Sequence, residues 1–169
     1  MDLFEAILNR RSIRKYTNHE IPEEIIEKLL RSAMYAPSAM NYQPWHFVIL
    51  NKKESLVKAF KAIPHAEMLQ QARAGIIVCG DNIAEKNVDY IVQNCSAATQ
   101  NILLAAHGLG LGGVWIGIYP VEETIKSIKE FFSLPKHIVP VALVSLGFPA
   151  ENIQSEERYS IEKIHHNKW

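Results

Sequence analysis

Apolar side chains recur with helical spacing in two stretches at the amino-terminal end of the chain. The first spans residues 2–9. The second begins at Pro22, whose two following glutamates suit the positive end of a helix dipole, and it stops before Pro37. The pattern therefore predicts two helices, separated by a polar and strongly basic segment.

Further along the chain, β-branched and aromatic runs are mixed with helical patterns. Runs typical of strands occupy residues 46–50, 75–80 and 137–148. Helical spacing occupies residues 54–62, 66–72 and 121–132. Because strands and helices do not alternate regularly, the sequence predicts the α+β class. No linker divides the chain, so we expect a single domain spanning residues 1–169.

The longest periodic segment, from Val88 to Leu109, predicts a long central helix. Its apolar seam consists of Val88, Ile91, Cys95, Ala98, Ile102, Ala105 and Leu109. Such a seam usually packs in a core, but the small side chains at 98 and 105 would also admit a second helix, so a subunit interface is an alternative. The polar segment from Ala150 onward is expected to wrap the surface.

Composition narrows the classes of function. The chain has 18 basic and 18 acidic residues among 169, which disfavours nucleic-acid binding. It has no apolar run long enough for a membrane span and no signal-peptide pattern, so we expect no membrane partner and a cytoplasmic location. The two cysteines are expected to be buried thiols, and the histidines lack metal-ligand spacing, so no metal is expected.

Positive charge is concentrated in the stretch RRSIRKY, residues 10–16. On residue types alone this stretch is either a solvated face or an anion site, because arginine forks and a serine hydroxyl suit phosphate oxygens. Five of the eight glycines lie between Gly108 and Gly117, a density that suits either a backbone lying against a planar ligand or a tight turn.

Three further stretches lie in order after the basic one: PSAMNYQPWHF from Pro37, GLGLGGVWIG from Gly108, and RYSIEKIHHNKW at the carboxyl end. Together the four stretches resemble the nitroreductase family of flavin mononucleotide (FMN) oxidoreductases in its shorter form. The resemblance implies a three-layer α-β-α fold with a mixed, mainly antiparallel sheet around a long central helix.

The resemblance also implies a role for each basic residue. Arg10 and Ser12, with Arg11, would bind the FMN phosphate, and Arg158 near the carboxyl end would join them. Arg14 would lie at the N1 edge of the flavin ring, where negative charge develops on reduction, and would favour the reduced form.

The other two motifs would surround the ring. In the family, the first loop approaches the flavin from the partner subunit of a domain-swapped homodimer; here its residues are Pro37, Ser38, Ala39 and Asn41. The glycine-rich stretch, here Trp115, Ile116, Gly117 and Ile118, places a backbone N–H at flavin N5. Ala39 and Gly117 replace a serine and a glutamate found in other members, which weakens those two assignments. The roles of Trp45 and Trp115 stay open between core and pocket, and Gln43 stays open between capping the turn before Pro44 and contacting the flavin.

The function implied is hydride transfer from NAD(P)H through flavin N5 to a nitroaromatic, quinone or similar acceptor, with no obligatory catalytic side chain. A specialised flavoenzyme on the same fold, such as a reductive dehalogenase or a flavin-consuming enzyme, is the first alternative. A flavin-binding module without activity is the second. The sequence does not identify the acceptor or the preferred nicotinamide.

Overall fold

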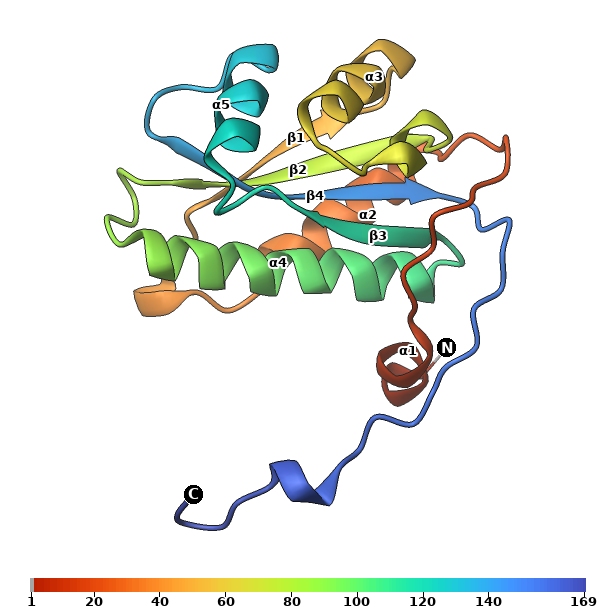
Figure 1. Ribbon diagram of the computed structural model, residues 1–169, viewed down its shortest axis with the longest axis vertical. Helices are drawn as coiled ribbons and strands as arrows, with labels where there is room; N and C mark the ends of the chain where they lie inside the picture. Colours follow the sequence, from red (N-terminus) through yellow and green to blue (C-terminus); the bar gives the residue numbers. More distant parts are fainter. Residues whose placement is uncertain (1) are drawn as a thin grey trace.

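A four-stranded sheet with helices on both faces forms the body of the protein (Figure 1). The computed structural model describes residues 2–169. The strands are β1 (Trp45–Leu50), β2 (Ala74–Asp81), β3 (Gly112–Gly117) and β4 (Ile138–Gly147). The α-helices are α1 (Leu3–Asn9), α2 (Glu23–Met34), α3 (Lys53–Ala62), α4 (Val88–Gly108) and α5 (Glu122–Phe131). Three short 3-10 helices are η1 (Ala39–Asn41), η2 (Glu67–Gln70) and η3 (Ile161–Lys163).

The strands lie in the order β1-β2-β4-β3, and each neighbouring pair is antiparallel. The edges of the sheet are therefore β1 and β3. Within residues 2–169, parallel pairing is limited to one isolated bridge between Ser12 and Gly113. The predicted α+β class and three layers are confirmed, and the parallel part of the expected mixed sheet is reduced to that bridge.

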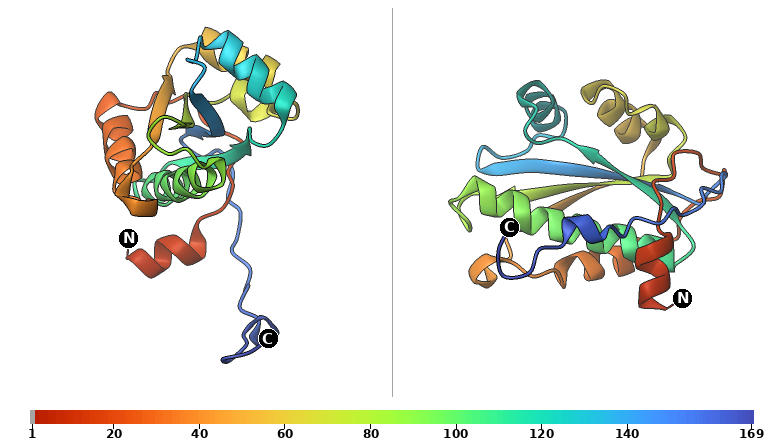
Figure 2. Two further views of the ribbon diagram at one scale, coloured as in Figure 1. Left: turned by 90° about the vertical axis from the view of Figure 1, so that its left-hand side faces the viewer. Right: turned by 60° about the horizontal axis from the view of Figure 1, so that its bottom comes forward.

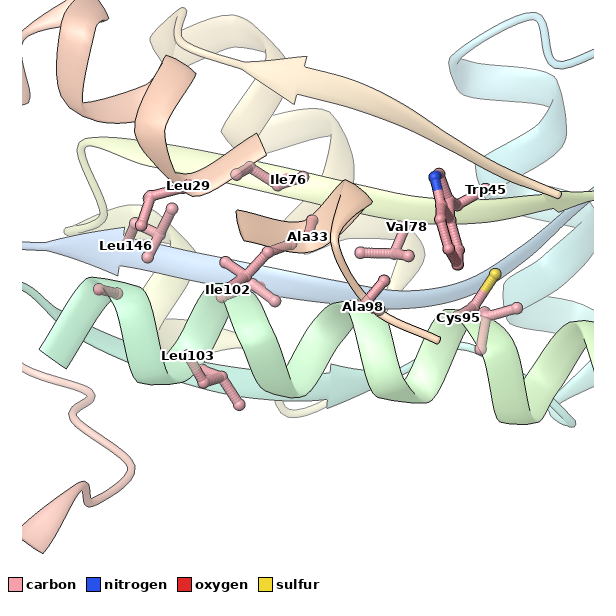
Figure 3. Close-up of a cluster of buried hydrophobic side chains, with 14 of the residues drawn as sticks. Leu29, Ala33, Trp45, Ile76, Val78, Cys95, Ala98, Ile102, Leu103 and Leu146 are labelled. Carbon is pink, nitrogen blue, oxygen red and sulfur yellow. The ribbon is translucent and has the colours of Figure 1, made fainter. Parts of the chain in front are cut away.

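Each face of the sheet carries its own core. Helices α2 and α4 cover one face, and α3 and α5 cover the other (Figures 1 and 2). The first core includes Leu29, Ala33, Ile76, Val78, Ala98, Ile102 and Leu146 (Figure 3). The second includes Leu56, Ala59, Ile77, Ile128 and Leu143. Because β2 and β4 are buried on both faces, they read as continuous apolar runs in the sequence.

The apolar seam of α4 lies mainly inside this chain. Ile91, Cys95, Ala98 and Ile102 are fully buried, in the core that α4 forms with α2 and the sheet. This part of the seam is therefore core packing within the chain, whereas Val88 and Ala105 are half-buried and Leu109 is exposed. Trp45 belongs to the same core, which resolves its role.

Two segments differ from the sequence prediction. Residues 66–72 form only the short 3-10 helix η2, because His65 before it has a φ of 62° and strand β2 begins at Ala74. The glycine-rich stretch, for which the sequence predicted no element, supplies the edge strand β3.

Helix α1 and the segment 152–169, called the tail below, stand apart from the body (Figures 1 and 2). The expectation that the carboxyl end wraps its own surface is wrong, because the tail extends away from the body and most of its residues are exposed. Helix α1 buries only Ala6, while Phe4 is 71% and Leu8 is 64% exposed. Both segments thus present apolar side chains that this chain does not cover.

The two cysteines lie on opposite sides of the sheet, Cys95 in the core beside α4 and Cys79 in the core beside α5. Both are free and fully buried. Burial raises the pKa of each thiol to about 12. No helix in residues 2–169 has the length and apolar character to cross a membrane. The cytoplasmic location stays a prediction.

Candidate cofactor site

The basic segment is held against the end of the sheet by backbone contacts. Arg10 ends α1 and donates its N–H to the carbonyl of Ala6. The N–H of Ile13 donates to the carbonyl of Gly113 at 3.1 Å. The Tyr16 hydroxyl donates to the Ile13 carbonyl at 2.7 Å and is hydrogen-bonded to the Ser145 hydroxyl at 2.7 Å. The chain therefore crosses the sheet end in a fixed path.

Two glycines make this crossing possible. A Cβ at Gly112 would lie 2.6 Å from Cγ2 of Ile13, and a Cβ at Gly147 would lie 2.6 Å from Cγ of Tyr16. No side chain fits at either distance, so close approach of the segment requires glycine. Gly110 has a φ of +79°, which suits the turn after α4. Gly110 and Gly112, two of the five glycines in the dense stretch, are thus explained without a ligand.

The arginines converge on a cavity of about 660 Å³ between α1 and the tail. Arg10, Arg11 and Arg158 line it together with apolar side chains of α1 and the carboxylates of Asp2, Glu5, Glu156 and Glu157. Among the described residues, none of these three guanidinium groups has a carboxylate within 4.0 Å of its nitrogens. We call this space the arginine cavity.

Burial and the like charges of Arg11 and Arg158 lower the pKa of the Arg10 guanidinium. Its Nε atom is buried and has no hydrogen-bond partner in residues 2–169. A buried charged donor without a partner is costly, and a bound anion would supply the acceptor that Arg10 Nε needs. The residues therefore fit a phosphate group, which supplies several acceptor oxygens.

A second cavity of about 370 Å³ adjoins the first, because Arg11, Asn9 and Ser155 line both. His107, in the last turn of α4, lines this second cavity. Its Nε2 atom is buried and unpaired within the described part of the chain. Burial, followed by the charges of Arg10 and Arg11, lowers the pKa of the imidazole.

The carboxylates near the arginines are mostly engaged by backbone groups. Glu151 Oε1 accepts the N–H groups of Arg14 and Lys15 at 2.7 and 3.1 Å. Glu157 accepts those of Arg158 and Tyr159, which lowers the pKa of its carboxyl. These glutamates fix the chain around the cavity and do not neutralise the guanidinium groups.

The loop at residues 37–43 has an unusual backbone. Met40, Asn41 and Gln43 have φ values of 51°, 56° and 48°. The N–H of Gln43 donates to the Ser38 hydroxyl at 3.0 Å, and Gln43 Nε2 donates to Asn41 Oδ1 at 2.8 Å. Gln43 thus orients Asn41, whose amide nitrogen has no hydrogen-bond partner among residues 2–169.

Within residues 2–169, some backbone N–H groups of strand β3 lie along its outer edge without a backbone partner. The N–H of Ile118 donates to the carbonyl of Val141. In this antiparallel pairing, every second residue of β3 therefore forms backbone hydrogen bonds with β4. The intervening N–H groups, those of Trp115 and Gly117, point away from β4 toward the open edge. These two donors are available to a ligand that lies along β3.

Comparison with known proteins identifies the family and the fold. The family model described as "Nitroreductase family" matches residues 7–78 and 64–148. The chain belongs to the nitroreductase family. A Methanothermobacter thermautotrophicus protein, provisionally named NADH dehydrogenase/NAD(P)H nitroreductase, is 47% identical over 169 residues, which cover 100% of this chain and 88% of that protein.

Solved nitroreductase structures agree in fold. One from Parabacteroides distasonis, with the same provisional name, is 40% identical with a TM-score of 0.94, and the match covers 99% of this chain and 98% of that one. One from Desulfovibrio desulfuricans, provisionally named a nitroreductase, was solved in complex with FMN. It is 30% identical with a TM-score of 0.86, and the match covers 100% of this chain and 98% of that one.

The nitroreductase fold brings some of the predicted site residues together. Arg10, Arg11 and Arg158 share the arginine cavity, whereas Ser12, which follows Arg11 in the chain, forms the bridge to Gly113 of β3 and lines neither cavity. Arg14 is exposed and lines neither cavity. Pro37, Ser38, Ala39 and Asn41 form a separate exposed or half-buried loop. Trp115 and Ile116 are half-buried and Gly117 is exposed on β3.

Ile118 differs from its neighbours. Its side chain is fully buried in the core beside α5, and its N–H is used by Val141. The sequence analysis did not predict a role for His107, Glu151 or Asn94. The contact made by Asn94 is described below. The one available signal was at Asn94, a polar residue on the same helix face as the apolar Ile91, Ala97 and Ala98.

Proposed function

We propose that this chain is a single nitroreductase-like domain, residues 1–169, that binds FMN and uses it to oxidise NAD(P)H. Its family and the names of its relatives support this function. One of these relatives is an FMN reductase of Bacillus subtilis at 23% identity. The observation that carries it for this chain is the arginine cavity, where Arg10 Nε is buried with no partner among residues 2–169, beside two further guanidinium groups.

Each cationic residue would have a distinct task toward FMN. Arg10, Arg11 and Arg158 would hold the phosphate, because their like charges repel one another until an anion lies between them. The hydroxyl of Ser12 would add a donor. Arg14, outside the cavity, would lie nearer the ring and stabilise negative charge at N1.

Backbone and loop groups would position the ring. The outward N–H groups of Trp115 and Gly117 would face it along β3, and Gly117 lacks a side chain that could obstruct the approach. Bound FMN would supply the redox chemistry, accepting a hydride from NAD(P)H and delivering electrons to an acceptor such as a nitroaromatic or quinone. The protein would bind, orient and tune it.

The proposal includes a homodimer with FMN at the interface, in which residues 37–41 approach the partner's flavin. The exposed apolar residues of α1 and the tail support it, because monomers rarely leave such surface uncovered. They include Leu3, Phe4, Leu8, Tyr159, Ile161 and Trp169. Because most of the apolar seam of α4 is buried inside the chain, we expect α1 and the tail to form the subunit contact in its place.

Purification and steady-state kinetics test the function. The purified protein should be yellow, and it should oxidise NAD(P)H when a nitroaromatic, a quinone or free flavin is added. A colourless preparation that takes up no FMN on titration contradicts the whole proposal. Bound FMN without NAD(P)H oxidation by any acceptor would leave only a flavin-binding module.

Sedimentation tests the dimer separately. FMN and the monomeric state should be mutually exclusive, because each site would need residues from both chains. A monomer that carries FMN contradicts the shared site while leaving the redox function intact.

A further inference from the structure

Asn94 is a buried polar residue within the apolar part of α4. Its exposed fraction is 5%, and the nearby Ile91, Cys95 and Ala98 belong to the core. Its Oδ1 atom accepts the backbone N–H of Ala39 at 3.0 Å, across 55 positions of the sequence. Because a backbone N–H can only donate, the facing amide atom must be oxygen, which fixes the orientation of the side chain.

This bond is the anchor of the loop at residues 37–43. The other hydrogen bonds that residues 37–43 make within the described chain connect the loop to itself: Gln43 to Ser38 and Asn41, and the backbone turns of Asn41 and Tyr42. The loop also holds three left-handed residues that are not glycine. Such backbone persists only where the surroundings fix it, so the Asn94 contact constrains a conformation that the loop would otherwise leave.

The asparagine carries a cost at its nitrogen and makes its contact through its oxygen. Its Nδ2 atom is buried with no partner among residues 2–169, and an unpaired buried donor carries a desolvation cost. An apolar side chain of similar volume would avoid that cost but would leave the N–H of Ala39 without this acceptor. The distinctive contribution of this polar residue is therefore the contact that its oxygen makes with the loop.

We propose that Asn94 is a positioning residue for the flavin site: it fixes the backbone of residues 37–43 so that Ser38 and Asn41 meet the ring. This proposal rests on the proposed function, because the loop's partner is the flavin. Through this contact, α4 of one subunit would position the loop that completes the partner's flavin site.

The test is Asn94→Leu, which keeps the side-chain volume and removes the acceptor. We expect backbone hydrogen exchange of residues 38–43 to accelerate in the purified protein. The dissociation constant for FMN should rise about tenfold, as expected for the loss of one well-placed hydrogen bond. The visible circular dichroism of the remaining bound FMN should change because the ring is held differently.

Two variants separate positioning from stability. Asn94→Asp keeps an oxygen for the Ala39 N–H but buries a charge, so it should lower the unfolding temperature and preserve the visible dichroism. Asn101→Leu is the matched control: this residue also lies on α4, but its Nδ2 donates to the carbonyl of Ser32 on α2 at 2.9 Å. It should affect stability and leave FMN affinity within about twofold.

The outcomes are distinct. If Asn94→Leu has wild-type FMN affinity and visible dichroism, the positioning role is wrong, whether or not the loop exchanges faster. If Asn101→Leu weakens FMN as much as Asn94→Leu, the effect is general destabilisation and the proposal is also wrong. Should Asn94→Leu fail to fold, loss of the wild-type dichroism in stable Asn94→Asp overturns it. Wild-type protein that binds no FMN contradicts the proposed function instead.

Discussion

Arg10 and Arg14 lie four positions apart, yet their surroundings differ. Arg10 lies in the arginine cavity, where burial and two neighbouring guanidinium groups lower its pKa, whereas Arg14 is exposed. A phosphate has the same charge in oxidised and reduced FMN, but the N1 edge of the ring gains charge on reduction. The two residues should therefore affect different properties of the cofactor.

Arg10→Ala should weaken FMN retention with little change in midpoint potential, whereas Arg14→Ala should lower the potential. A charge-assisted hydrogen bond lost from the reduced state alone corresponds to a downward shift on the order of 30 to 60 mV for a two-electron couple. Spectroelectrochemical titration of both variants measures this. An unchanged potential in FMN-loaded Arg14→Ala would show that this residue does not tune the flavin.

His107 makes the apo protein sensitive to pH. In the folded state, burial and then the charges of Arg10 and Arg11 lower the pKa of its imidazole below the ordinary value of about 6.5. Near and below that pH, the unfolded chain therefore binds the proton more readily than the folded chain does. Stability should therefore fall as the pH drops through that value, and His107→Gln should flatten the slope. Urea unfolding of both apo proteins at about pH 8 and about pH 5.5 compares them. Bound phosphate should reduce the slope, because its negative charge favours the imidazolium.

At the scale of elements, the crossing of residues 13–16 over the sheet end depends on glycine. Gly112→Ala should destabilise the protein by about 1 to 3 kcal/mol, because its Cβ would lie 2.6 Å from Ile13. Gly108→Ala is the control: it ends α4 with no atom within 4 Å of the new Cβ, so it should stabilise by about 0.4 to 1 kcal/mol. Denaturant unfolding gives both values. Equal effects would mean that close packing does not explain Gly112.

The local pattern of apolar residues was sufficient to predict the elements that bury a regular apolar face. Helices α2, α4 and α5 and strands β1, β2 and β4 lie within a few residues of their predicted positions. Strand β3 was missed because glycine has low strand propensity, and its place depends on partners from distant segments. The helix predicted at 66–72 was too short to nucleate against the adjoining turn and strand.

The residues of the candidate site also fall into those that the sequence could predict and those that it could not. Arg10, Arg11 and Ser12 could be predicted because they are contiguous and chemically distinctive. That Arg158 shares their cavity followed from the family resemblance and not from any local signal. The Asn94 contact with Ala39 and the role of His107 depend on tertiary packing across many residues, and one sequence does not reveal such pairs.

At the scale of the whole molecule, the proposed dimer implies that each flavin site draws on two chains. A hybrid of an Arg10→Ala subunit and an Asn41→Ala subunit would then contain one site with both lesions and one intact site. The purified hybrid should bind FMN with wild-type affinity at about half of the wild-type capacity, although both parent homodimers bind weakly. Hybrids carrying two different tags allow this titration. If the hybrid binds no better than its parents, the loop serves its own subunit's flavin.

The two cysteines give the molecule built-in reporters of its own opening. Cys79 and Cys95 lie in different cores, both fully buried, and each thiol has a pKa of about 12. A thiol-directed reagent near neutral pH therefore has no thiolate to attack until a layer of helices lifts from the sheet. Identifying which cysteine is alkylated first by mass spectrometry would reveal whether the α2–α4 layer or the α3–α5 layer opens more readily, with no engineered label.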